Sequence, residues 1–238
     1  MTDAEYDIEA AAVTDRIMSM PANSRVAAAC RGSANPAALA WLSEALDIGP
    51  DVRVGDFGAG IGGPAAWLAR HWRCDVVAVD PAPGSVRGAR ALFEVPVVQA
   101  AAQHLPFRLD AFDVGLLLGV ISVVEEPGAV LREVGRVASR LGVLDYCSSR
   151  SVAVHAGGST FPTPDALIGM CQAHGWSVSD GLTIDVLAPP LWTAAAETAQ
   201  RGVVVPEAER EVIAAIESGA LTPFMLTAFR RTSMDATA

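Results

Sequence analysis

The stretch that decides the fold is Val54-Gly55-Asp56-Phe57-Gly58-Ala59-Gly60-Ile61-Gly62-Gly63-Pro64. A strand runs through glycines directly into a helix whose first turn carries a proline, a favoured residue at that position. Glycines at such a junction let the backbone approach a ligand closely and leave the first helical N–H groups free to face it. The stretch therefore predicts a ligand-binding turn at the carboxyl end of a strand in an α/β domain.

The glycine spacing fits two kinds of binding turn, and Asp56 separates them. Gly58, Gly60 and Gly63 match the dinucleotide fingerprint Gly-x-Gly-x-x-Gly, which is a weak signal alone. Asp56 followed by Gly58, Gly60 and Gly62 fits a second pattern equally well. An acid at this position would face a pyrophosphate with the wrong charge, but it is well placed to hold a cationic group such as an amino-acid ammonium. We therefore favour a positively charged ligand.

Strands and helices alternate from residue 50 onward, which is typical of a parallel sheet with helices on both faces. The expected strands are residues 52–57, 75–80, 95–100, 112–118, 141–147, 176–186 and 221–232. The expected helices are 64–70, 85–93, 127–138, one that follows a Thr163 cap and stops at Gly175, 191–201 and 206–218. Pro223 near the start of the last strand favours an edge position for that strand.

Helices are also expected in front of this core, over residues 4–18 and from an Asn35 cap to about residue 46. We expect residues 1–49 to form a helical lid segment, residues 50–238 a ligand-binding domain, and residues 187–220 a helical insertion. Both outer segments flank the carboxyl ends of the strands, so we expect a largely apolar chamber there. Its expected lining is Val152, Val154, Phe161, Leu187, Leu191, Trp192 and Val203 to Val205.

The composition excludes several classes of function. The formal net charge is −10, from 27 acidic and 17 basic residues, so nucleic acid and anionic membrane are not expected partners. All 17 basic residues are arginines, which rules out Schiff-base chemistry and the lysines of P-loop and kinase sites. The four cysteines form no C-x-x-C pair, and His71 and His104 lack a second ligand at metal spacing, so no metal site is expected.

The chain carries no expected membrane or export signal. Its longest apolar runs fall short of the roughly 18 residues that span a bilayer, and its acidic start does not resemble a secretory signal. We therefore expect a cytoplasmic protein. With 51% hydrophobic and 18% charged residues, the chain can bury one large core, and a homodimer is compatible with the sequence.

Over about residues 52–232 the sequence resembles the class I S-adenosylmethionine (SAM)-dependent methyltransferases. The segments that carry the resemblance are Asp56-Phe57-Gly58-Ala59-Gly60-Ile61-Gly62, Asp80-Pro81, Leu105-Pro106-Phe107, Phe112-Asp113, and Leu131-Arg132-Glu133-Val134-Gly135-Arg136-Val137-Ala138. The resemblance implies a Rossmann-like, doubly wound, seven-stranded and mostly parallel sheet with an antiparallel last strand. It also implies SAM as the cofactor and a small-molecule acceptor.

The resemblance assigns roles to individual residues. It implies that Gly58, Gly60 and Gly62 approach the methionine and ribose part of SAM, that Asp56 supports its ammonium, and that Asp80 accepts hydrogen bonds from both ribose hydroxyls. Asp80 lies 20 residues after Gly60, the distance at which nucleotide folds place a ribose-binding acid. The full expected cofactor site is Arg31, Asp56, Gly58, Ala59, Gly60, Gly62, Asp80, Pro81, Ala102, Gln103 and Gly119.

One position departs from the family pattern. Many relatives have an Asp at the position of Ala101, where it binds the adenine amino group. Gln103 can supply an amide oxygen instead, or the Ala102 backbone and packing against Pro81 can hold the base. The departure leaves open weaker SAM binding and a degenerate site. Gly119 and Val120 match the place where relatives flank the methionine portion, and Arg31 is expected to pair with the SAM carboxylate.

Methyl transfer from a sulfonium is an in-line displacement, to which an enzyme contributes mainly proximity and orientation. A weakly nucleophilic acceptor also needs a base. The candidates are Ser122, Asp145, Tyr146 and His155, and we select His155, in the expected loop after the fifth strand. Asp113 is left outside the site, because an acid at the start of a strand often caps neighbouring backbone.

Two rival functions are kept. An NAD-dependent oxidoreductase on a related sheet is disfavoured by Asp56 and by the helix-rich insertion before the final strand. A non-catalytic SAM-binding protein is motivated by Ala101 and by the lack of a clear base.

Overall fold

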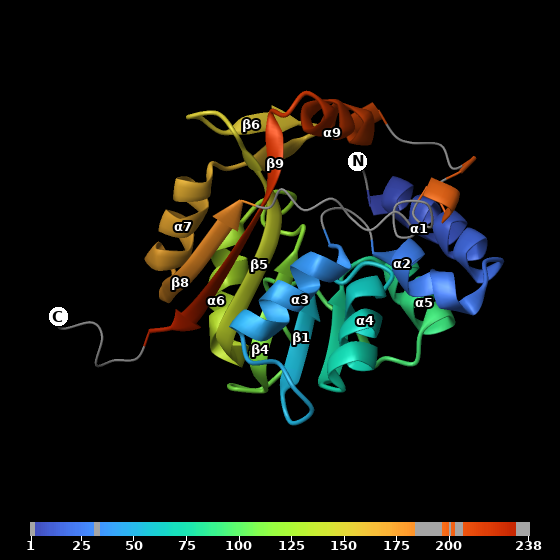
Figure 1. Ribbon diagram of the computed structural model, residues 1–238, viewed down its shortest axis with the longest axis horizontal. Coiled ribbons are helices and arrows are strands. Elements are labelled where there is room, and N and C mark those ends of the chain that lie inside the picture. The colour runs from blue at the N-terminus through green and yellow to red at the C-terminus, as the bar shows by residue number, and fades with distance from the viewer. Residues whose placement is uncertain (1–2, 31–33, 184–196, 200, 203–206, 232–238) are drawn as a thin grey trace.

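The computed structural model describes residues 3–30, 34–183, 197–199, 201–202 and 207–231 (Figure 1). Its centre is a seven-stranded sheet in the order β3-β2-β1-β4-β5-β9-β8. The strands are β1 Arg53–Phe57, β2 Asp75–Asp80, β3 Val97–Gln99, β4 Phe112–Leu118, β5 Ala138–Ser148, β8 Trp176–Thr183 and β9 Leu221–Arg230. Only the pairings of β9 are antiparallel within this sheet. The predicted Rossmann-like sheet with an antiparallel last strand is confirmed.

The described helices are α1 Asp3–Met18, α2 Arg25–Ala29, α3 Pro36–Ala45, α4 Gly63–Trp72, α5 Pro83–Leu92, α6 Pro127–Val137, α7 Pro164–Ala173 and α9 Glu207–Glu217, with a 3-10 turn at Ala22–Ser24. The predicted helices that are described begin within two residues of their expected starts, whereas α2 was not predicted. The Asn35 side chain accepts hydrogen bonds from the first turn of α3, and Thr163 does the same for α7. Gly175, with φ at +89°, follows the end of α7.

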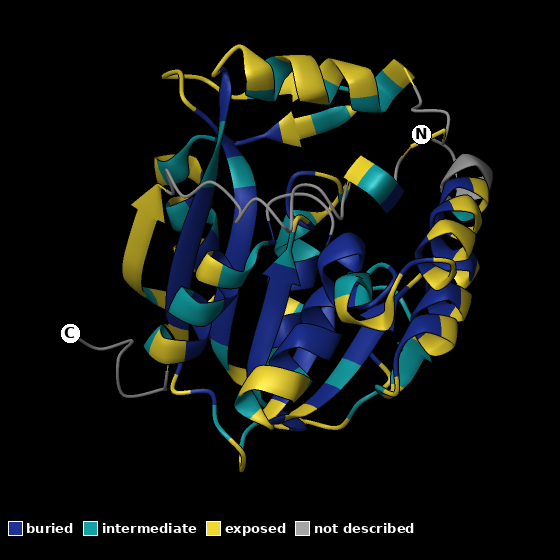
Figure 2. Ribbon diagram, turned by 45° about the vertical axis from the view of Figure 1, so that its right-hand side comes forward, coloured by how far each residue is buried: buried dark blue, intermediate teal, exposed yellow. Residues whose placement is uncertain are grey.

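Apolar side chains fill both faces of the sheet, as a doubly wound fold requires. Along β4, Val114 and Leu116 belong to the core beneath α3 and α4, whereas Leu117 belongs to the core beneath α6 and α7. Val76 and Val79 of β2 divide in the same way. Figure 2 shows the central strands buried between outward-facing helix surfaces. This arrangement leaves the carboxyl ends of the strands as the edge where irregular segments meet.

The predicted edge position of the last strand is wrong. β9 lies between β5 and β8, so it is internal to the sheet. Pro223 is opposite Tyr146 of β5, while the described pairing of β8 ends with Thr183 opposite Phe224.

A short hairpin, β6 Val154–Ala156 with β7 Ser159–Phe161, replaces part of the loop expected after the fifth strand. Gly157 and Gly158 connect its strands with φ angles of +58° and +77°, the left-handed pair that a tight hairpin turn needs. The Thr160 amide donates to the Ser122 carbonyl at 3.0 Å, which fixes the hairpin beside the loop after β4.

The described part of the N-terminal segment packs on the helices that follow β1 and β2. Helix α1 lies along α5, and α2 lies against α4 (Figure 1). The Gly84 amide in the first turn of α5 donates to Asp7 Oδ1 of α1 at 2.7 Å. A lid role for residues 1–49 stays a prediction.

Only part of the expected 187–220 insertion is described, chiefly α9, which lies over the β6–β7 hairpin (Figure 1). The Gly157 amide donates to Glu211 Oε2 of α9 at 2.8 Å. Leu187, Leu191, Trp192 and Val203 to Val205 lie outside the described residues. Among the helices that are described, none has the length and apolarity to cross a membrane.

Candidate functional site

The glycine turn leaves β1 with three residues in the left-handed region. The φ angles of Gly58, Gly60 and Gly62 are +83°, +54° and +81°. A β-carbon on Gly58 would collide with the Val120 side chain, so the turn and the loop after β4 are in close contact. The Gly58 amide also donates to the Val79 carbonyl at 2.7 Å. Only glycine can adopt a positive φ and also leave room for the Val120 side chain at this position without strain.

Asp80 ends β2 and ties the glycine turn to the start of α5. Its Oδ2 accepts the Gly60 amide at 2.8 Å, and its Oδ1 accepts the Ala82 amide at 3.0 Å. Burial raises the pKa of Asp80, while these two amides oppose the shift and the nearby Asp7 adds to it. Since an ionised carboxylate offers about four acceptor sites, each oxygen can still accept a hydroxyl. The 20-residue spacing between Gly60 and Asp80 in the sequence thus corresponds to a direct hydrogen bond between them.

Asp56 is a buried acid whose carboxylate lacks a hydrogen-bond partner within the described part of the chain. It lies inside β1 between Ala78 of β2 and Leu116 of β4, with 0% of its surface exposed. Among the described residues, none gives either carboxylate oxygen a hydrogen bond of acceptable geometry. Burial and then the charge of Asp80 raise its pKa from 3.8 to about 7, against a weak opposing effect of the Ala65 amide. An orphaned buried carboxylate is costly, which indicates that a donor belongs beside it.

The end of α2 lies near this acid. Burial raises the pKa of the Cys30 thiol, and the charge of Asp56 contributes to the shift. Gly63 packs directly against the backbone of Ala29. The N-terminal segment therefore reaches the glycine turn. Arg31, predicted to hold the SAM carboxylate, lies outside the described residues.

The segment after β3 meets the end of β2. The Ala100 amide donates to the Asp80 carbonyl at 3.2 Å, and the Gln99 side chain donates to the Pro81 carbonyl at 3.3 Å. Ala102 is buried and Gln103 is half-buried in the turn that follows. The loop that carries the predicted base-binding residues therefore starts beside the predicted ribose-binding acid.

Gly119 lies across the strand ends from this loop, in the third segment of the predicted cofactor site. Its φ is +75°, and a β-carbon there would meet nothing within 4 Å. Its amide donates to the Leu144 carbonyl at 2.7 Å, which fixes the segment that also carries Val120. All predicted cofactor residues except Arg31 therefore lie at the carboxyl ends of β1, β2, β3 and β4.

The candidates for a base have different surroundings. Asp145, 1% exposed, accepts the Ser122 hydroxyl at 2.7 Å and the Ser122 amide at 3.0 Å. It therefore fixes the loop after β4 to β5. Burial, and then the charge of Asp145, raise the pKa of Tyr146, so its phenol is a poor base. His155 is exposed on β6, not in a loop, and its Nδ1 lies 3.0 Å from Thr160 Oγ1.

A pocket of about 640 Å³ lies among the loop after β4, the β6–β7 hairpin and α7. Its walls include Ser122, Val123, Val152, Thr160 and Met170. The volume is in the range of small-molecule sites. Of the predicted chamber residues that are described, Val152 lines this pocket, whereas Val154 and the buried Phe161 do not. His155 does not line the pocket, but it bonds to Thr160, which does.

Asp113 serves the backbone, as predicted. Its Oδ2 accepts the Arg53 amide at 2.8 Å, at the start of β1 and away from the glycine turn. A second hollow of about 400 Å³ opens at this opposite end of the sheet, beside Arg53 and Asp75. It is remote from the predicted site residues.

Sequence reasoning missed two pairings. Ser122 bonds to Asp145, and Glu133 and Arg136 bond to the loop after β3. The partners are 23 to 31 residues apart, so no local spacing indicates them. The signal that could have found the second pairing is the joint occurrence of the Leu105-Pro106-Phe107 and Glu133/Arg136 motifs.

Comparisons with known proteins agree with this geometry. Residues 55–144 match a family described as "Methyltransferase domain". The chain is 32% identical to "Methyltransferase GfsG" of Streptomyces halstedii over 116 residues, which are 44% of this chain and 41% of that protein. The match thus spans less than half of the length of this curated relative.

Solved structures share the fold. The crystal structure of the [4+2]-cyclase SpnF aligns with a TM-score of 0.68 and 20% identity, covering 82% of this chain and 81% of that one. Geranyl diphosphate C-methyltransferase from Streptomyces coelicolor A3(2), in complex with Mg²⁺, geranyl diphosphate and S-adenosyl-L-homocysteine, aligns with a TM-score of 0.61 and 16% identity. That alignment covers 82% of this chain and 79% of the other.

Proposed function

This chain carries a domain of the class I SAM-dependent methyltransferase family, and from that premise we propose that it transfers a methyl group from SAM to a small, largely apolar organic acceptor. The observation that carries the proposal is the pair of buried acids at the glycine turn. Asp56 lacks a partner among the described residues, and Asp80 holds the turn while keeping free acceptor sites. The resemblance read from the sequence motifs is confirmed for the family and for the fold.

These residues fit SAM better than a dinucleotide. SAM supplies a methyl group on a positively charged sulfur and also carries an ammonium, so a site with two acids attracts it. A pyrophosphate at the glycine turn would instead be repelled by the charge of Asp56. Asp56 would accept the ammonium, Asp80 the ribose hydroxyls, and the turn at Gly58 and Gly60 would allow close approach. Ala59, Gly62, Pro81, Ala102, Gln103 and Gly119 would complete the contacts, with Arg31 proposed for the carboxylate.

The pocket beside the hairpin supports a small acceptor. Val123 and Val152 are 61% and 65% exposed at its wall, and Met170 is half-buried there, so an apolar molecule would cover them. One structural neighbour is by its title a methyltransferase in complex with a small isoprenoid diphosphate. Another carries the name of a cyclase, so the fold alone does not decide between methyl transfer and another reaction. A mass-spectrometric search for metabolites that gain a methyl group in lysate with labelled SAM separates an active enzyme from a non-catalytic binder.

Replacing Asp80 with Asn tests the cofactor assignment. We expect SAM and S-adenosylhomocysteine to bind the wild type in calorimetry, and the variant to bind tenfold to a hundredfold more weakly. Asn can still accept hydrogen bonds but carries no charge, so each of the two hydroxyl bonds should lose roughly 1 kcal/mol, the difference between a bond to a charged group and a neutral one. Asp113→Asn is the matched control, because it removes a strand-end acid on the opposite edge of the sheet. Heat with NAD but with neither SAM nor its product would reject the proposal.

His155 is proposed as the general base that takes a proton from the molecule to be methylated. His155→Ala should lower turnover on the order of a hundredfold, a typical contribution of a positioned base, while SAM affinity stays unchanged. The control is His71→Ala, since His71 is exposed on α4 and stacks on Trp67. The rate is followed with the acceptor that the mass-spectrometric search identifies. Equal turnover in both variants would remove His155 from the mechanism.

A further inference from the structure

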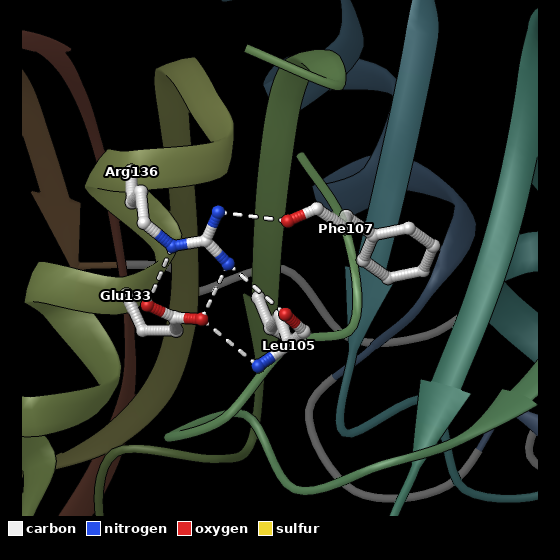
Figure 3. A network of polar contacts seen from close by, with 4 residues as sticks. All are labelled: Leu105, Phe107, Glu133 and Arg136. Carbon is white, nitrogen blue, oxygen red and sulfur yellow. Dashed lines mark hydrogen bonds and ion pairs between the residues drawn. The ribbon is translucent and has the colours of Figure 1, made fainter. Parts of the chain in front are cut away.

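Two residues of α6 hold the loop after β3 through its main chain (Figure 3). Arg136 Nη1 donates to the Phe107 carbonyl at 2.7 Å, and Nη2 donates to the Leu105 carbonyl at 3.0 Å. Glu133 Oε1 accepts the Leu105 amide at 2.9 Å. The two side chains also bond each other, from Arg136 Nε to Glu133 Oε2 at 2.9 Å and from Nη2 to Oε1 at 2.6 Å. Leu105 is therefore bonded through both its amide and its carbonyl.

This arrangement differs from an ordinary surface ion pair. The side chains of Arg136 and Glu133 are 36% and 19% exposed, and an isolated pair on one helix would add little stability. Here the two charges together make three hydrogen bonds to backbone that lies 28 to 31 residues away, and charge-assisted bonds of this kind fix geometry well. These hydrogen bonds therefore fix the position of the loop after β3.

The loop has few other polar means of contacting a ligand. Its first residues, Ala100, Ala101 and Ala102, offer only main-chain groups, and the polar side chains before Leu105 are those of Gln103 and His104. Its start is fixed beside Asp80 by the Ala100 amide. Its end is fixed by α6 and by the Phe107 ring, which packs edge-on against Phe112 with centroids 4.9 Å apart. Recognition of a base by the three alanines depends on where their main chain lies.

We propose that Glu133 and Arg136 are positioning residues that set the main chain of residues 101–107 to recognise the adenine of the bound nucleoside, without touching the ligand themselves. This inference rests on the proposed function, because it assigns the base of SAM to this loop. This role explains why the Leu105-Pro106-Phe107 motif and the Glu133/Arg136 motif occur together. An alanine in place of a base-binding acid at position 101 makes the placement of the backbone more important.

The test compares S-adenosylhomocysteine with S-inosylhomocysteine, which carries a carbonyl in place of the adenine amino group. Calorimetry gives the ratio of their dissociation constants, and this ratio does not depend on the folded fraction. We expect the wild type to prefer the adenine compound at least tenfold. Glu133→Gln and Arg136→Lys should weaken binding of the adenine compound about tenfold and bring the ratio close to one. Both replacements keep side-chain size, so the folded state is expected to persist.

Asp110→Asn is the matched control. Asp110 Oδ1 pairs with Arg230 Nη1 at 2.7 Å, and Arg230 bonds the Gly135 carbonyl on the same helix, next to the network. This variant should change the melting temperature without changing the ratio. A purely structural role predicts the same result for Glu133→Gln and Arg136→Lys, and that result would overturn the inference. A wild type that binds both compounds equally would also overturn it, whereas a wild type that binds neither compound would instead reject the proposed function.

Discussion

Asp56→Asn is expected to weaken SAM binding a hundredfold or more while making the free protein more stable at pH 8. The two effects share a cause. Asp56 is fully buried and has no hydrogen-bond partner among the described residues, so its charge is costly until a cation arrives. Removing one member of a buried charged pair costs about 2–5 kcal/mol of binding free energy. Asn keeps the size of the side chain but never carries the charge.

The pH dependence follows from the direction of the shift. The pKa of Asp56 rises from 3.8 in a solvated chain to about 7 in the fold. Between these values the folded state binds more protons than the unfolded state, so the free energy of unfolding falls as pH rises from about 4 to about 7. The full loss is on the order of 4 kcal/mol, from about 1.4 kcal/mol per pKa unit. Denaturant titrations at pH 5 and pH 8 should show this slope in the wild type and a smaller slope in Asp56→Asn.

Ligand binding should show the reverse dependence. Because an ammonium prefers the ionised carboxylate, SAM affinity should rise with pH up to about 7, and binding below that pH should release a proton. Calorimetry in buffers with different ionisation enthalpies measures the proton. Asp113→Asn should leave the slope and the affinity as they are in the wild type, since Asp113 bonds the backbone of Arg53. Equal affinities and equal pH slopes in wild type and Asp56→Asn would show that Asp56 holds no cationic group.

Buried parallel strands were the most predictable part of the fold. β2 and β4 match the predicted ranges residue for residue, because the interior of a strand covered on both faces is mostly apolar. The β6–β7 hairpin was missed. Its strands have three residues each, too few for a pattern of alternation, and without such flanking strands Gly157-Gly158 predicts a loop and not a tight turn. The internal position of β9 depends on strand order, which long-range pairing decides.

The candidate site also has a part that sequence spacing predicted and a part that it did not. The glycine turn and Asp80 followed from spacing, because their contact joins the ends of two adjacent parallel strands. Asp145 was considered as a base, yet the structure shows its carboxylate engaged by Ser122. That engagement joins the loop after β4 to β5, and only the packed sheet brings them together. Sequence spacing thus indicates chemistry at one strand end, but not contacts between segments.

The second large effect is expected for Gly63→Ala, which tests how the N-terminal segment meets the glycine turn. Gly63 is the first residue of α4, and a β-carbon there would collide with the backbone carbon and oxygen of Ala29. These backbone atoms of Ala29 cannot rotate out of the way as a flexible side chain can. Ala29 is also 3% exposed, at the end of the buried helix α2. Overpacking of this kind costs about 3 kcal/mol or more where the surroundings are rigid.

Gly169→Ala is the matched control for this substitution. Gly169 lies inside α7, and a β-carbon there meets nothing within 4 Å. Alanine should stabilise that helix by roughly 0.5–1 kcal/mol, because it lowers the entropy of the unfolded chain. Denaturant midpoints should therefore move in opposite directions for the two variants.

The reactivity of Cys30 shows where the strain of Gly63→Ala goes. This thiol is 6% exposed, and burial raises its pKa, so the folded wild type should react slowly with a disulfide reagent. If α2 shifts to relieve the collision, labelling of Cys30 should become faster under conditions in which the protein stays folded. The other three cysteines are buried too, so the labelled site is identified by peptide mass. An unchanged midpoint together with slow labelling would mean that α2 does not press on the first turn of α4. The predicted lid over residues 1–49 would then lose its contact with the glycine turn.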